Sequence, residues 1–167
     1  MILEVLWLHF NKSILKFNKK APFGAFFVFN STMEFILYTS LFFCNIFMIG
    51  VSIVTQFVTY PSFKFIHIKE FSKFHKGYTR KMLFIVGPIM SIEFLSAVFL
   101  LYINANLHFF IQFGLVSLIW ILTFFLIVPI HNELENQFNN KLNRKLIKFN
   151  GIRTLLWIIK LIFLCII

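Results

Sequence analysis

Long apolar segments constrain this chain more than any other feature of its sequence. A helix of about 20 apolar residues crosses the hydrocarbon core of a bilayer, and three segments reach that length without a charge that would break the pattern, apart from a single carboxylate, Glu93. A fourth, shorter segment is interrupted by Arg153 and Lys160, and it spans if its helix begins in the preceding loop or if these side chains snorkel. The sequence therefore predicts an all-α polytopic membrane protein, a four-transmembrane-helix bundle with spans at about 35–60, 82–103, 107–130 and 150–167.

Composition supports a lipid environment and argues against nucleic acid as a partner. The chain is 59% hydrophobic with a mean hydropathy of +0.85, which leaves too few polar residues to cover a soluble globule. Most of the residues behind the net charge of +10 lie outside the apolar segments, where membrane topology explains them. Cys44 and Cys165 lie at similar depth, so a disulfide is geometrically possible, although two buried apolar side chains are the favoured interpretation.

The distribution of Lys and Arg predicts the topology. The loop from Pro61 to Lys81 carries six basic residues against Glu70, and the loop from His131 to Gly151 also has more basic than acidic residues. The turn at 104–106 carries no charge. By the positive-inside rule, loops one and three face the cytoplasm, while loop two and both termini lie outside. The expected location is the bacterial cytoplasmic (inner) membrane.

The N-terminal region, residues 1–32, disagrees with this topology because it contains four lysines on the predicted outer side. Two explanations stay open. The region forms an interfacial helix, or the start codon is mis-called and translation begins at Met33. In either case residues 33–167 are expected to form a single transmembrane domain, with no internal repeat.

Glu93 is the strongest candidate for a functional residue, because an ionised carboxylate at bilayer depth normally faces a partner or a water-filled cavity. Helical rise places Glu93 and Lys160 both roughly 15 to 16 Å from the cytoplasmic face, which predicts an ion pair between them. Such a pair serves function or simply fixes helix packing. Gly87-Pro88 should kink the helix about one turn before Glu93 and open space beside its carboxylate.

A second layer of polar residues is predicted nearer the cytoplasmic face, drawn from all four helices. One interpretation is a pocket for an amphipathic ligand, with its head group against Arg153, His131 and Tyr60. The other is an ordinary interfacial belt of aromatic and basic residues. No span carries the His and acid spacing of a metal site, so no metal ligand is assigned and the cofactor stays unknown. The ligand-binding candidates are Gln56, Tyr60, Tyr78, Asn132, Arg153, Trp157 and Lys160; the catalytic candidates are Glu93, His131 and His75.

Five short blocks carry a family resemblance: Q-F-V-T-Y-P at 56–61, F-x-K-F-H-K-G-Y at 71–78, G-P-I-M-S-I-E at 87–93, V-P-I-H-N-E-L at 128–134 and N-G-I-R-T-L-L-W at 150–157. Over about residues 45–160 the chain resembles an uncharacterised family of small bacterial integral membrane proteins. Gly151 departs from the Trp usual in that family, and Lys160 stands where Arg is common. A more distant similarity is to the anthrone-oxygenase-like four-helix membrane proteins, which are associated with oxidation of aromatic polyketides. This similarity implies a shared fold more than a shared reaction.

Two hypotheses for function follow. The first is a small membrane enzyme or binding protein that binds or oxidises a lipophilic small molecule, with Glu93 as proton acceptor, His131 or His75 as proton relay, and Arg153 holding an anionic group. The alternative is a non-enzymatic accessory subunit whose buried charges lock helix packing, with a membrane-protein partner or a second copy of the chain. Whether the protein is an enzyme stays open. A transporter is less favoured, because four helices without an inverted repeat offer little for alternating access.

Overall fold

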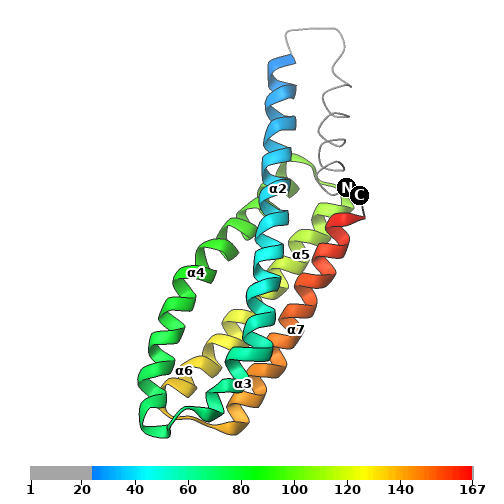
Figure 1. Cartoon of the computed structure of the whole chain (residues 1–167). Helices are drawn as coiled ribbons and strands as arrows, with labels where there is room; N and C mark the ends of the chain where they lie inside the picture. The colour runs from blue at the N-terminus through cyan, green and yellow to red at the C-terminus, as the bar shows by residue number, and fades with distance from the viewer. Residues whose placement is uncertain (1–23, 167) are drawn as a thin grey trace.

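The computed structural model describes residues 24–166, and they are almost entirely helical, with no strand in that range (Figure 1). Cys165 is exposed and Cys44 buried, and both are free thiols. Most of the N-terminal region discussed above, residues 1–23, lies outside the described part of the chain.

The first long helical segment begins at Gly24, earlier than the predicted span. Helix α2 (Gly24–Val54) runs without interruption into a π-helical turn η1 (Thr55–Thr59), the short α3 (Tyr60–Ser62) and a 3-10 turn η2 (Phe63–Phe65). Pro61 was expected near the end of this helix, but the helical path continues past it. Proline lacks a backbone N–H, and the wider turn before it, in which Tyr60 N–H bonds the Thr55 carbonyl, accommodates the missing donor.

The second helix, α4 (Ile68–Ile103), begins well before the predicted start at Met82. Most of the predicted loop one is therefore helix, capped by the His67 side chain, which accepts from Lys69 N–H. The added turns are amphipathic, since Phe71 and His75 are fully buried on one face. Pro88 lies inside α4, which continues through it.

The third segment repeats the π-turn arrangement of the first. Helix α5 (Leu107–Leu122), capped by Asn106, passes into a π turn η3 (Thr123–Ile127) and then α6 (Val128–Asn136). Val128 N–H donates to the Thr123 carbonyl just before Pro129. In the same way, Tyr60 N–H donates to the Thr55 carbonyl just before Pro61. Helix α7 (Asn140–Cys165) follows, with Asn139 as its N-cap.

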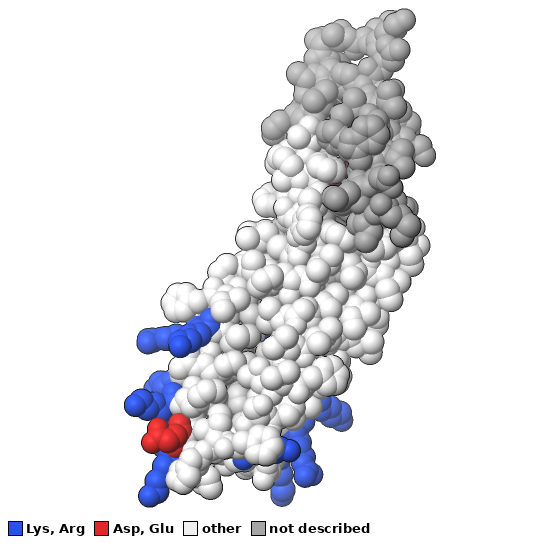
Figure 2. Space-filling view, in the orientation of Figure 1, with Lys and Arg blue, Asp and Glu red and all other residues white. Residues whose placement is uncertain are grey.

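The helices pack side by side, with α2 and α5 each in contact with both α4 and α7 (Figure 1). Three clusters of buried apolar side chains lie along the interior, one at each end and one between them. Three helical segments, 31–65, 68–103 and 107–136, are long and apolar enough to cross a membrane. Figure 2 shows that the visible Lys and Arg side chains gather toward the end that carries α3, the start of α4 and the α6–α7 connection.

Candidate functional site

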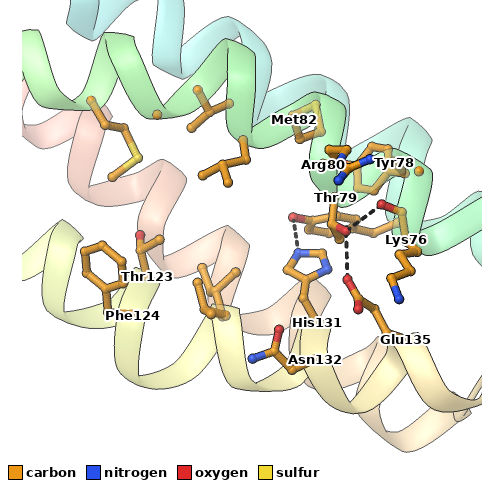
Figure 3. Close-up of a pocket in the computed structure, with 18 of the residues that line it drawn as sticks. Lys76, Tyr78, Thr79, Arg80, Met82, Thr123, Phe124, His131, Asn132 and Glu135 are labelled. Carbon is orange, nitrogen blue, oxygen red and sulfur yellow. Dashed lines mark hydrogen bonds between the residues drawn. The ribbon is translucent and has the colours of Figure 1, made fainter.

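A cavity of about 920 Å³ opens between α4 and the segment formed by α5, η3 and α6 (Figure 3). Figure 3 shows side chains from both walls projecting into the space between the two ribbons. The lining residues are Tyr60, Lys73, Lys76, Gly77, Tyr78, Thr79, Arg80, Met82, Leu83, Val86, Gly87, Met90, Ser91, Trp120, Thr123, Phe124, Ile127, Val128, His131, Asn132, Glu135 and Arg153.

The lining of the cavity changes character along its length. Toward the middle of the molecule it is apolar, with Val86 and Met90 on α4 facing Trp120 on α5. Toward the basic end it becomes polar and charged. There Thr79 Oγ1 donates to Glu135 Oε1 at 3.0 Å, which ties α4 to α6 beside the cavity. A chamber with one apolar end and one polar end matches an amphipathic occupant.

Three of the predicted site residues form a hydrogen-bonded chain, in which Tyr60 and His131 line the cavity and His75 lies behind them. His131 Nδ1 lies 3.1 Å from His75 Nε2, and His131 Nε2 lies 3.3 Å from the Tyr60 hydroxyl. His75 is fully buried and stacks on Phe71. If His75 donates from Nε2, His131 accepts at Nδ1 and donates from Nε2 to Tyr60, so neutral imidazoles satisfy both contacts. The structure thus brings His75, His131 and Tyr60 together, as an interior relay would require.

Arg153 reaches the cavity from α7 and is only 7% exposed. Its Nη2 donates to Asn150 Oδ1 at 2.9 Å and its Nη1 to Thr123 Oγ1 at 3.4 Å. The guanidinium also lies over the Trp157 ring, 5.1 Å from the centroid. Its Nε has no hydrogen-bond partner among the described residues. Every polar partner that holds this cation is therefore neutral.

The predicted ion pair between Glu93 and Lys160 is confirmed. Lys160 Nζ lies 2.5 Å from Glu93 Oε1, and Trp157 Nε1 donates to Glu93 Oε2 at 3.2 Å. All three residues have no exposed surface. None of these three residues lines the cavity, although Gly87, Met90 and Ser91, on the same helix α4 as Glu93, do. The space near Pro88 therefore opens on the face of α4 that carries Ser91, and Trp157 separates the ion pair from Arg153.

Two residues around this ion pair were missed by the sequence reasoning. In the amide orientation that satisfies both groups, Asn45 donates to the Trp157 carbonyl at 3.3 Å and accepts from Leu161 N–H at 3.1 Å. Gln112 Nε2 donates to the Lys160 carbonyl at 3.2 Å. Both are fully buried, so all four long helices contribute a polar side chain to one sealed layer. In the sequence, each of them is a single amide side chain within an apolar segment, and that was the signal that could have identified them.

The remaining predicted ligand-binding residues divide between two places. Tyr78 and Asn132 line the cavity with His131. Gln56 does not; its Oε1 accepts from Asn150 Nδ2 at 2.9 Å, between the π turn η1 and α7. An added Cβ at Gly151 would lie 3.4 Å from Gln56 Nε2, so a bulky side chain there would require Gln56 to move.

Within residues 24–166, no group of three His, Cys, Asp or Glu side chains is placed to hold a metal ion. His75 and His131 lie together, and their facing ring nitrogens are hydrogen-bonded to each other.

No family model matches the chain, and no curated protein or solved structure is significantly similar to it. The function accordingly has to be inferred from the geometry of the site.

Proposed function

We propose that the chain is a multi-pass membrane protein with four spanning helices that binds a lipophilic small molecule in the cavity between α4 and α5–α6. The cavity carries this proposal, because its lining passes from apolar to polar within one chamber. Its volume of about 920 Å³ lies at the upper end of the roughly 300–1,000 Å³ typical of ligand pockets.

The proposal of a fourth span depends on the charges that interrupt α7. A charge facing lipid at the centre of a bilayer costs roughly 2.5 kcal/mol or more. Lys160 has no exposed surface and is paired with Glu93, while Arg153 is 7% exposed and stacks on Trp157. Both charges face the interior, and apolar side chains such as Leu155 and Ile162, which are more than half exposed, face outward. Helix α7 can therefore present an apolar surface to lipid.

Exposed aromatic side chains on the other helices support the same environment. Phe57, Phe84 and Phe125 are each at least 74% exposed. In water this much bare apolar surface would favour aggregation, whereas in a bilayer it faces acyl chains. The basic end of the molecule (Figure 2) is then expected on the cytoplasmic side of the inner membrane.

The orientation can be tested by labelling single cysteines in intact cells, in a background with Cys44 and Cys165 replaced by alanine. A membrane-impermeant maleimide should label Ala105→Cys directly, but Gln137→Cys only after the membrane is opened. Both positions are exposed and lie in connections between helices. The reverse pattern would contradict the topology.

Ligand binding can be tested by native mass spectrometry of the protein extracted gently from its own membrane. The wild type should carry a stoichiometric small molecule. Ser91→Phe, which fills the cavity from α4, should lose it. Leu95→Phe adds the same ring one turn further along α4, where the side chain is 52% exposed and does not line the cavity, and it should keep the adduct. An empty wild type, or identical adducts on both variants, would contradict the proposal.

A second candidate function is supported by the sealed ion pair. Glu93, Lys160 and Trp157 have no exposed surface, so they suit a packing lock in a structural or accessory subunit. In this alternative the functional surface is the outside of the helices, facing a membrane-protein partner or a second copy. A stable complex with a protein subunit, together with an empty cavity, would favour it.

A further inference from the structure

Arg153 is a cation that the described part of the protein does not neutralise. It is 7% exposed, and the groups around it are uncharged: it donates to the oxygens of Asn150 and Thr123, and the Tyr60 hydroxyl lies beside it. The one ion pair found in the part of the chain that the structure describes joins Glu93 to Lys160, away from the cavity. A buried charge is normally paired, because desolvation is costly. The structure therefore presents a guanidinium with capacity for an anion.

Arg153 keeps an unused hydrogen-bond donor and also borders the cavity. Its Nε has no hydrogen-bond partner within the described range, and the side chain is part of the cavity lining. Guanidinium groups bind carboxylates and phosphates through paired N–H donors, with charge-assisted bonds stronger than neutral ones. Tyr60 lines the same region, and its hydroxyl can donate to an anion while it accepts from His131 Nε2.

The net charge of the cavity lining is positive, as is the charge of Arg153. Four cations border the cavity, Lys73, Lys76, Arg80 and Arg153, against one carboxylate, Glu135, which accepts a hydrogen bond from Thr79. The first three project from α4 at helical spacing and are exposed. They form a basic rim at the polar end of the cavity, where Figure 3 labels Lys76 and Arg80.

We infer that the occupant of the cavity is an amphiphile with a compact anionic head, a carboxylate or a phosphate, bound by Arg153, and a lipophilic body held between Met90, Trp120 and Phe124. The basic rim attracts such molecules from the leaflet on its own side. This inference rests on the proposed binding function and adds the chemical class of the ligand.

The test compares two probes that differ only in the head group, a dibrominated long-chain fatty acid and the corresponding fatty alcohol. The protein is reconstituted in bilayers of zwitterionic lipid, at a pH where the acid is ionised. Bromine quenches nearby indoles, and Trp120 lines the cavity, so saturable quenching that is lost in Trp120→Phe reports occupancy. We expect the acid to bind roughly ten- to a hundredfold more tightly than the alcohol.

The preference for the acid should disappear in Arg153→Gln, while binding of the alcohol continues and shows that the variant is folded. Arg153→Lys, which keeps the charge, should retain much of the preference. Lys145→Gln is the matched control, because it removes an exposed cation from the same helix away from the cavity, and it should behave as wild type.

The outcomes separate the inference from the proposed function. Equal saturable quenching by acid and alcohol would overturn the anionic head and leave lipophilic binding intact. No saturable quenching by either probe would overturn both. Displacement of the fatty acid by inorganic phosphate at comparable concentration would assign Arg153 to a free anion and overturn the amphiphile.

Discussion

Removing one charge of the sealed ion pair should destabilise the protein far more than removing both. Glu93 and Lys160 have no exposed surface, and their charged atoms are 2.5 Å apart. At an effective dielectric constant of about 20, that separation corresponds to roughly 7 kcal/mol of Coulomb attraction. Desolvation of the two ions offsets most of it, at several kcal/mol per ion. The net contribution of the pair is therefore small, but a lone buried charge keeps its desolvation penalty without the attraction.

The expected values follow from what each variant leaves behind. Glu93→Gln retains an oxygen for Trp157 Nε1 but leaves the Lys160 ammonium unpaired, and should cost about 3–5 kcal/mol. Lys160→Met should cost a similar amount. The double variant Glu93→Gln with Lys160→Met should lie within about 1–2 kcal/mol of wild type, and the exchanged pair Glu93→Lys with Lys160→Glu should also recover stability.

The assay is reversible unfolding in mixed micelles of a mild detergent and dodecyl sulfate, followed by far-UV circular dichroism for the wild type and each of these variants. Ser96→Ala serves as a control for a small change in a buried position one turn from Glu93. The reasoning is refuted if Glu93→Gln changes the free energy of unfolding by less than about 0.5 kcal/mol, or if the double variant is as unstable as the sum of the single variants.

Two further substitutions test the hydrogen-bonded layers. Asn150→Leu should cost about 2–4 kcal/mol in the same assay, because it removes the bonds that Asn150 donates to Gln56 Oε1 and the Ser52 carbonyl and the one it accepts from Arg153 Nη2. A loss below about 1 kcal/mol would show that water replaces Asn150. Gln112→Leu should cost no more than about 1 kcal/mol, because only one bond, to the Lys160 carbonyl, is lost and Gln112 Oε1 already lacks a partner among the residues described; a cost above about 2 kcal/mol would mean that this oxygen is satisfied in the membrane.

The sequence predicted the long apolar helices, because hydropathy over about 20 residues is a strong signal. It did not predict that α4 begins at Ile68. The first turns of α4 are rich in lysine, and counting charges identified them as a loop. The buried positions Phe71 and His75, one turn apart, were the helical signal within that charge.

Depth along a helix was predictable, but rotation about its axis was not. Constant rise per residue sufficed to match Glu93 with Lys160, and the structure confirms the pair. Which face of α4 borders the cavity depends on tertiary packing, so Ser91 lines it whereas Glu93 does not. Spacing along the chain could not show that His131 lines the cavity whereas Glu93 lies apart from it.

The π turns were also missed, although the sequence contained a sign of them. Thr55 and Thr123 each begin a π turn, and each precedes a proline, Pro61 or Pro129, by the same spacing. Propensity rules treat proline as the end of a helix, whereas here the wider turn lets the helix continue. The second of these turns borders the cavity, since Thr123, Phe124 and Ile127 line it.

The most direct test of the cavity as a ligand site is photo-crosslinking from two adjacent positions in native membranes. A benzophenone amino acid replaces Phe124, which lines the cavity, or Phe125, which is 74% exposed and does not. After irradiation, mass spectrometry of the protein should show one dominant small-molecule adduct at position 124 and a mixture of bulk membrane lipids at position 125. The same lipid mixture at both positions would contradict the account.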